Sequence, residues 1–356
     1  MFKRLCALLF ALALLLATGA ACSERYDLTG RKRVAGKAVA ALIEELSALP
    51  PGTDVDLTGV SIKMDDQLTL LSALPELHFV WRVAFADVQA DGDTETLDLD
   101  ALTKKRLGVV TLRKALSALP KLRRVVMFQQ ALKVSEKEAL MAEHPDVVFD
   151  WSVRIEPYLI RIDTTAFSTL KGRQKPRYTA DALAALRYCT QLRALDFGHN
   201  DVSDLRFLTN WPQLRVLIIV DSKTPIRDLS PLAELSELEY VELFMQDITD
   251  ISALANKPRL LDLNLCHNNV TDLSPLYGNT AMERLWISYN PNLTDDEIAA
   301  FQRAVPGCVV ERDSYQSTGA GWRKHERYAV IQKMFDSRVY LPFAGGADEA
   351  REDERR

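Results

Sequence analysis

The stretch Leu260-Leu261-Asp262-Leu263-Asn264-Leu265-Cys266-His267-Asn268 decides the fold of this 356-residue chain. Its pattern has apolar residues at the first, fourth and sixth positions and an amide at the ninth. Copies of it begin at Leu192, Leu214, Leu238, Leu260 and Met282, which places them 22, 24, 22 and 22 residues apart. A fixed period of this length is typical of a solenoid, in which each repeat stacks on its neighbours. Such a chain presents a long surface more readily than a deep catalytic pocket.

The fourth copy shows what each position of the repeat does. The alternation from residue 262 to 266 predicts a short strand with leucines pointing inward and polar residues pointing outward. Asn268 then turns inward, where its amide can bond backbone groups that would otherwise be buried and unpaired. Pro275 favours a tight turn over a long helix on the far side of the coil. Aspartates that can bond exposed backbone N–H groups recur at this turn, namely Asp204, Asp228, Asp250 and Asp272. The amide position holds Asn200, Ser222, Gln246, Asn268 and Asn290.

Residues 192–297 resemble the internalin-type leucine-rich repeats of bacterial cell-surface proteins. The residues that carry the resemblance are Leu238-x-x-Val241-x-Leu243-x-x-Gln246-x-Ile248-Thr249-Asp250-Ile251 and Leu260-x-x-Leu263-x-Leu265-x-x-Asn268-x-Val270-Thr271-Asp272-Leu273-Ser274-Pro275-Leu276. They belong to a region that covers about 30% of the chain. The resemblance implies an α/β leucine-rich-repeat solenoid whose curved parallel sheet lines a concave face that binds protein ligands, without enzymatic activity. We expect helical coils in the N-terminal half and short 3-10 or turn coils after residue 191.

The N-terminal half contains a longer repeat of 70 residues. This offset aligns Leu46-Ser47-Ala48-Leu49-Pro50 with Leu116-Ser117-Ala118-Leu119-Pro120, and it pairs Phe79 with Phe149, Trp81 with Trp151 and Val83 with Val153. Each unit reads as helix, strand, helix and strand, followed by an alternating W-x-V segment that predicts a hairpin. We expect Trp81 and Trp151 to pack against these hairpins. Capping-box patterns at Ser135–Glu138 and Thr294–Glu297 predict helix starts.

The predicted domain order follows from these repeats. Residues 1–21 form a signal peptide, residues 22–170 the two long repeat units and residues 171–307 the internalin-type repeats. Residues 308–343 form a C-terminal cap that hides the apolar end of the stack. Residues 344–356 form a mixed-charge tail, for which the composition predicts disorder.

The N-terminus predicts export. Lys3 and Arg4 precede an apolar run too short to span a bilayer comfortably, and small residues follow before Cys22. The stretch Gly19-Ala20-Ala21-Cys22 resembles a bacterial lipoprotein cleavage site, although Gly19 stands where that motif usually has leucine. Two interpretations stay open, lipidation of Cys22 and simple secretion. We therefore predict a protein that is lipid-anchored on the extracytoplasmic side of the cell membrane, or secreted.

The composition excludes several classes of function. Without residues 1–21 the chain has 42 basic and 49 acidic residues, a net charge of −7, and shows no basic stripe for nucleic acid. Besides Cys22, this part of the chain has only Cys189, Cys266 and Cys308, which is neither a disulfide framework nor a metal-binding spacing. We expect no metal and no cofactor.

The outward strand positions predict the binding surface. A solvated sheet face should be polar, yet several of these positions are apolar or aromatic, which favours a ligand-binding patch. The predicted ligand-binding residues are Ile218, Val220, Tyr240, Glu242, Phe244, Asp262, Asn264, Arg284 and Trp286. Two alternatives would also explain an apolar face, because the C-terminal segment or another copy of the chain could fold over it.

No residues point to catalysis. Glu242 and Asp262 should lie roughly 8 Å apart, a spacing that suits an inverting glycosidase, but an open face excludes little water. His199 and His267 should lie roughly 14 Å apart, too far to share a metal. Cys266 could be a reactive thiol or a small neutral filler. We therefore predict a non-enzymatic cell-envelope protein that recognises a protein partner. The alternative is a glycan- or peptidoglycan-associated binding protein.

Overall fold

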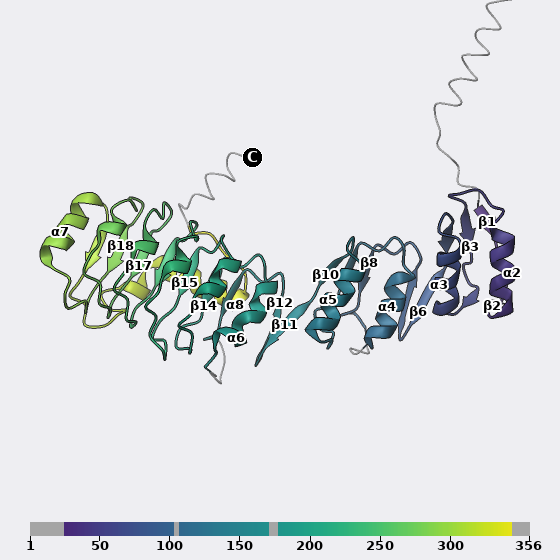
Figure 1. Ribbon diagram of the computed structural model, residues 1–356, viewed down its shortest axis with the longest axis horizontal. Coiled ribbons are helices and arrows are strands. Elements are labelled where there is room, and N and C mark those ends of the chain that lie inside the picture. Colours follow the sequence, from purple (N-terminus) through teal and green to yellow (C-terminus); the bar gives the residue numbers. More distant parts are fainter. Residues whose placement is uncertain (1–24, 103–106, 171–176, 344–356) are drawn as a thin grey trace, which may run out of the picture. The chain divides into compact units, whose positions relative to one another are not determined.

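The computed structural model describes residues 25–102, 107–170 and 177–343, which form two compact units (Figure 1). The first unit runs to Trp151 and the second begins at Ser152. The predicted signal peptide, Cys22 and the predicted tail lie outside the described residues. Among the helices that are described, none is long and apolar enough to cross a membrane.

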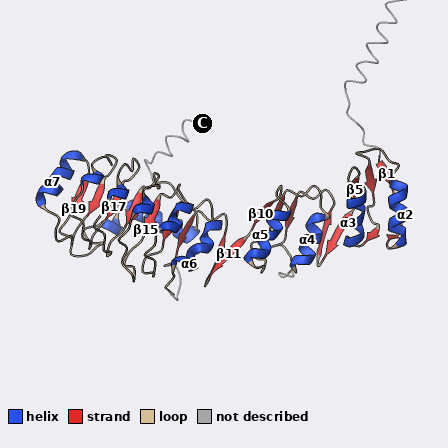
Figure 2. Ribbon diagram, in the orientation of Figure 1, coloured by secondary structure: helices blue, strands red, loops and turns tan. Residues whose placement is uncertain are grey.

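The first unit contains two successive sets of helices and strands. Its first copy contains β1 (Arg25–Asp27), β2 (Arg33–Val34), α2 (Lys37–Leu46), β3 (Asp54–Asp56), β4 (Ser61–Ile62), α3 (Met64–Ala73), β5 (His78–Val80), β6 (Arg82–Phe85) and β7 (Val88–Asp91). Its second copy contains β8 (Thr96–Asp98), α4 (Val109–Ser117), β9 (Arg124–Val126), α5 (Val134–Glu143) and β10 (Val148–Asp150). Each copy builds a three-stranded parallel sheet, β1-β3-β5 or β8-β9-β10, so helix and strand alternate as predicted (Figure 2).

A hairpin follows each of these sheets. Strands β6 and β7 pair antiparallel after the first sheet, and β11 (Ser152–Ile155) pairs with β12 (Tyr158–Arg161) after the second. The tryptophan that precedes each hairpin is buried, as expected. The Trp81 ring stacks on Phe79 with 4.7 Å between ring centroids, and the Lys137 ammonium lies 4.9 Å from the Trp151 ring.

The helix starts agree only partly with the capping patterns. Thr294 is the N-cap of α7 (Asp295–Ala304), where its hydroxyl accepts the Glu297 N–H at 3.2 Å. The prediction at Ser135 is wrong, because α5 already begins at Val134. There the Lys133 backbone N–H donates to the Glu136 carboxylate at 2.8 Å. A lysine at the cap position hides this start from sequence patterns, which rest on short polar caps.

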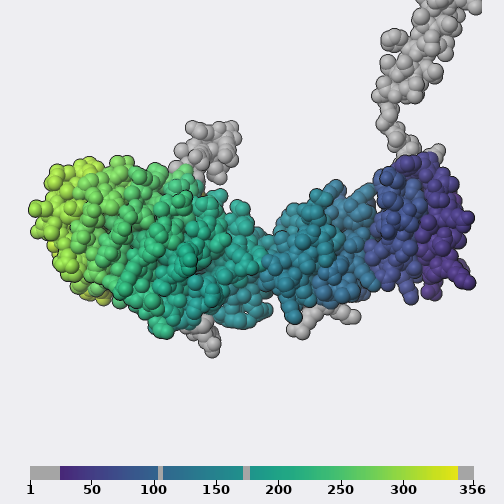
Figure 3. All heavy atoms as spheres, viewed as in Figure 1, coloured from purple at the N-terminus to yellow at the C-terminus, as the bar shows by residue number. Residues whose placement is uncertain are grey.

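The second unit is built on a seven-stranded parallel sheet. Its strands, in order, are β13 (Ala166–Ser168), β14 (Ala194–Asp196), β15 (Val216–Ile218), β16 (Tyr240–Glu242), β17 (Asp262–Asn264), β18 (Arg284–Trp286) and β19 (Val309–Glu311). The register aligns the middle residue of each strand, and the middle residues of β14 to β18 are fully buried leucines and a valine. The strands pair in chain order, and the colours of this unit in Figure 3 change in the same order, from teal to yellow-green.

The far side of the coils before β18 is short, as the repeat predicts, whereas the coil between β18 and β19 carries the helix α7. The short coils hold α6 (Ala180–Leu183) and 3-10 helices at Ala184–Tyr188, Arg206–Asn210, Ser230–Leu232, Ser252–Leu254 and Ser274–Leu276. Pro231 and Pro275 lie in the first turn of their 3-10 helices. The recurring aspartates accept the backbone N–H two residues further on, as Asp272 does from Ser274 at 2.7 Å. The expected change from helical to short coils is confirmed.

The buried amides join neighbouring coils. Asn268 accepts the Ile248 N–H at 3.1 Å and donates to the carbonyls of Leu243 and Leu265 at 2.9 and 3.0 Å. Gln246 accepts the Ile226 N–H at 2.9 Å in the same way, so its longer side chain fills the role of asparagine.

Replacing Asn268 by alanine should destabilise the second unit by about 2–4 kcal/mol. The substitution leaves buried backbone groups of two coils without partners, each at a cost of about 1–3 kcal/mol before relaxation. The free energy of unfolding can be measured by urea denaturation. Asn210→Ala is the matched control, because Asn210 is exposed and its amide donates to the Phe207 carbonyl of its own turn. Equal losses in the two variants would contradict the role of the amide.

Candidate functional site

The parallel register brings the nine predicted binding residues together on one face of the second sheet. Tyr240 aligns with Asp262, and Asp262 with Arg284. The next row aligns Ile218, Glu242, Asn264 and Trp286 in the same way. We call this surface the concave face, the name that the repeat family implies for the outward side of the strands.

The expectation that these side chains are exposed is wrong. Each of the nine is at most 7% exposed, and Tyr240, Glu242, Asp262 and Asn264 are fully buried. They lie under residues 312–343, which we call the C-terminal arm. Of the alternatives that the sequence left open, the arm covering the face is the one in the structure. Of the predicted cap, only β19 extends the sheet; the arm lies across the strands instead.

The arm consists of a segment of loop and turns (312–321), a 3-10 helix (Trp322–Lys324), α8 (Glu326–Ser337) and a short irregular end. Its apolar side chains share one cluster with the concave face. From the arm these are Trp322, Ile331, Met334, Phe335, Tyr340 and Phe343. Trp322 lies at the centre, with ring centroids 5.4 Å from Tyr240 and 5.1 Å from Trp286.

Glu242 is the first polar anchor of the arm. Its carboxylate accepts the Trp322 indole N–H at 2.7 Å, the Tyr240 hydroxyl at 2.5 Å and the Arg323 guanidinium at 2.6 Å. Burial opposes the charge of Arg323, but the attraction of Glu242 raises the pKa of this guanidinium above its ordinary value. Burial and the Glu242 carboxylate raise the pKa of the Tyr240 hydroxyl well above its usual range, so it remains a donor.

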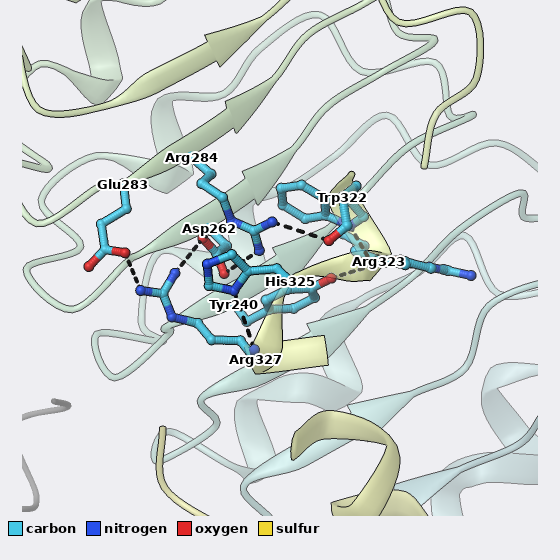
Figure 4. A network of polar contacts seen from close by, with 9 residues as sticks. Tyr240, Asp262, Glu283, Arg284, Trp322, Arg323, His325 and Arg327 are labelled. Atoms are coloured by element: carbon cyan, nitrogen blue, oxygen red, sulfur yellow. Dashed lines mark hydrogen bonds and ion pairs between the residues drawn. The ribbon is translucent and has the colours of Figure 1, made fainter. Parts of the chain in front are cut away.

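Asp262 is the second polar anchor (Figure 4). Arg284 from the neighbouring strand donates to both carboxylate oxygens at 2.8 Å. Arg327 from the arm donates to one of them at 2.8 Å and also bonds Glu283. Arg284 in turn donates to the Trp322 carbonyl at 3.1 Å and lies 4.5 Å from the Trp322 ring. The anchor therefore couples two guanidinium groups, one on the sheet and one on the arm, to a single carboxylate.

Further bonds hold both ends of the arm. Near its start, Asn264 donates to the Ser317 carbonyl at 2.7 Å and Trp286 to the Gly319 carbonyl at 3.2 Å. Near its end, the N–H groups of Thr165 and Ala166 donate to the Arg338 carbonyl, both at 3.2 Å. These last bonds lie at β13, at the opposite end of the sheet from β19. The arm thus spans the sheet from its last strand to its first.

The residues of the arm that cover the concave face were not predicted from the sequence. Trp322, Arg323 and Arg327 are not among the predicted site residues, although they lie within the predicted C-terminal cap. A signal was available, because the arm reads Trp322-Arg323-Lys324-His325-Glu326-Arg327 and the face carries two acidic residues. The spacing of these arginines can be matched to Glu242 and Asp262 only when the register of the strands is known, because the register sets the distance between the two carboxylates.

The remaining candidates occupy structural positions. His199 pairs with Asp221 at 3.0 Å, and His267 stacks on Tyr289 with ring centroids 4.0 Å apart. Burial raises the pKa of the Cys266 thiol to about 11, which opposes a reactive thiolate. Glu242 and Asp262 are held in separate ion pairs. The aromatic residues that a glycan would need, Tyr240 and Trp286, are both covered.

No known family model matches the chain, and no curated protein matches it either. Similar solved structures include internalin C2 of Listeria monocytogenes, with 16% identity, coverage of 63% of this chain and 79% of that one, and a TM-score of 0.34. Internalin F of the same organism has 19% identity, coverage of 81% and 68%, and a TM-score of 0.35. A leucine-rich-repeat protein of Leptospira interrogans has 15% identity, coverage of 72% and 71%, and a TM-score of 0.37.

These identities and TM-scores are low, so the fold assignment rests on the strand order, the register and the buried amides of this chain itself. By those features the second unit is a leucine-rich-repeat solenoid, and its repeats resemble those of the internalin type.

Proposed function

We propose that this protein is a non-enzymatic binding protein of the cell envelope, and that the concave face of its second unit recognises a protein partner. In the absence of that partner the arm occupies the face. The proposal keeps the export and the Cys22 lipid anchor that the sequence predicts, with secretion as the alternative. The anchor would tether the N-terminus and leave the second unit above the membrane.

The observation that carries the proposal is the way the arm is bound. A polypeptide segment with turns and an α-helix lies on the face through a central tryptophan and two arginines, and each arginine is paired with its own carboxylate. Buried aromatic and arginine anchors of this kind dominate protein–protein interfaces. The face can therefore hold a polypeptide segment.

A second observation supports exchange of the arm for a partner. The arm follows the last strand of the sheet, so its departure leaves the order and pairing of β13 to β18 unchanged. Glu242 and Asp262 would then meet water or the charges of the partner. The Arg323 side chain is already 34% exposed, so one end of the anchor network lies within reach of solvent.

The test is photo-crosslinking in the cells that make the protein, with benzoylphenylalanine in place of Trp286. With the intact arm, the adduct should be internal and should join position 286 to residues near Gly319. Arg323→Ala combined with Arg327→Ala should weaken the arm, lower the internal adduct several-fold and raise one adduct with a single other protein. Mass spectrometry identifies both products.

Lys324→Ala is the matched control, because Lys324 is an exposed residue between the two arginines. It should leave the internal adduct unchanged. If the weakened arm gives no adduct with another protein, despite normal amounts of folded chain, the concave face is a closed core and the proposal fails.

A further inference from the structure

A small pocket lies between α8 and the first strands of the second sheet. Its volume is about 220 Å³, well above the ~30 Å³ that one water occupies. The sheet side contributes Ser168, Leu170, Asp196 and Ile218. The arm contributes Arg323, Tyr328, Ile331, Gln332 and Phe335. Gln332 is exposed and Tyr328 is half-buried, so the mouth of the pocket is on the arm side.

Asp196 is the distinctive residue of this pocket. Its side chain is buried, with the residue 5% exposed, and it accepts the Ser168 hydroxyl at 2.8 Å and the Gly198 N–H at 3.1 Å. Both donors are neutral. Within the described parts of the chain, no lysine or arginine forms an ion pair with this carboxylate. A buried carboxylate without a cation is unusual, because charged groups leave water only at a high cost.

The charges around the pocket do not balance. Arg323 is the positively charged residue in the lining of the pocket. Its guanidinium already forms an ion pair with the Glu242 carboxylate at 2.6 Å, and it lies 5.1 Å from the centroid of the Tyr328 ring. When Asp196 is ionised, two carboxylates therefore share one guanidinium, and the group carries one net negative charge. Burial is the main reason that the pKa of Asp196 rises to about 6, and at neutral pH the carboxylate is still mostly ionised.

The residues that line the pocket indicate which kind of cation would pair with Asp196. Ile218, Ile331 and Phe335 offer apolar surface that an aliphatic chain can cover. Each oxygen of Asp196 already accepts one hydrogen bond, so a guanidinium would need a second bond to both oxygens in one plane. A compact ammonium group needs no such geometry.

We propose that this pocket binds a primary alkylammonium group, from a lysine side chain or from a free aliphatic amine, with the ammonium on Asp196. The methylene stem lies against the apolar walls, and the mouth beside Gln332 admits the rest of the ligand. The arm forms half of the pocket, so a bound ammonium also holds the arm on the sheet. The site does not depend on the recognition of a partner by the concave face.

Titration calorimetry and saturation-transfer NMR on the full-length mature chain test the proposal, with butylammonium and Nα-acetyl-lysine methylamide as probes. Asp196→Asn keeps the size of the side chain and removes its charge, and it should weaken binding roughly tenfold or more. Asp228→Asn, at an exposed turn, is the matched control and should bind as the unmodified chain does. Butan-1-ol, which lacks the charge, should not bind.

The pH gives an independent reading. The other titratable or charged groups that face Asp196 are Glu242, Arg323, Tyr328 and Tyr158. With a pKa of about 6, Asp196 is about one-tenth ionised at pH 5, so the affinity should fall roughly tenfold between pH 7.5 and pH 5. Asp196→Asn should remove this dependence.

The two probes separate the sources of the ligand. Tighter binding of the lysine derivative supports a lysine side chain, and tighter binding of butylammonium supports a free amine. Absence of binding by both probes, equal binding by Asp196→Asn, or an affinity that does not change with pH would each overturn the proposal. None of these results bears on photo-crosslinking at position 286, so the two proposals can fail separately.

Discussion

Replacing Trp322 by alanine should release the arm from the concave face and leave the coils of the second unit folded. Trp322 is fully buried between Tyr240 and Trp286, and its indole N–H is bonded to the Glu242 carboxylate. Truncation of a buried tryptophan costs about 3–5 kcal/mol. Trp322 is the arm residue that contacts both central aromatic rings and the Glu242 carboxylate, so we expect the arm to lose its docked state after such a loss.

Trp211→Ala is the matched control for this variant. Trp211 is also buried, but it lies within a coil, where its indole N–H donates to the Cys189 carbonyl at 2.9 Å. Its loss should lower the free energy of unfolding of the whole second unit in urea. Trp322→Ala should instead expose the concave face to a hydrophobic dye well below the main urea transition. A single transition shifted equally in both variants would contradict a separable arm.

Asp262→Asn should have a comparable effect for an electrostatic reason. The substitution leaves the guanidinium groups of Arg284 and Arg327 without their shared carboxylate. Removing one partner of a buried ion pair costs about 3–5 kcal/mol. The arm can avoid most of this cost by undocking, because both guanidinium groups then return to water. We therefore expect arm release, seen as rapid proteolysis between residues 312 and 343, with the coils intact.

Two further variants separate the charge from the shape of this site. Arg327→Met in addition to Asp262→Asn removes one stranded charge and keeps a long side chain, so it should restore part of the docking. Asp272→Asn is a control at an exposed turn and should cost no more than about 1 kcal/mol. If Asp262→Asn resists protease as the unmodified chain does, the ion pairs do not hold the arm.

The repeat in the second unit could be predicted in detail because its determinants are local. The residues that define the repeat pack or form hydrogen bonds within one coil or with a neighbouring coil. They include the leucines at 263 and 265, the amide at 268 and the aspartate at 272. One copy of the repeat is therefore enough to predict the strand, the inward-pointing amide and the tight turn on the far side of the coil. The 70-residue offset predicted the N-terminal elements in the same way.

The state of the concave face could not be predicted in this way. Its outward residues were identified, but whether they meet water depends on contacts such as Trp322 with Glu242, which lie 80 positions apart in the sequence. A contact between residues so far apart leaves no periodic pattern in the amino-acid sequence. The same apolar composition fits an exposed binding patch and a surface covered by the chain itself. Asp196 likewise becomes unusual only when the arm that buries it is in place.

Hydrogen exchange measured by mass spectrometry, on the intact chain and on Trp322→Ala, tests whether the arm can leave the concave face while the coils stay folded. We expect amides of residues 314–343 in the intact chain to exchange through an opening that costs less free energy than opening of the coils. In Trp322→Ala these amides should lose nearly all protection, while those of β14 to β17 keep theirs. Simultaneous exchange of the arm and the coils in both proteins would show that the arm is an inseparable part of the core. That result would contradict an arm that leaves the concave face while the coils stay folded.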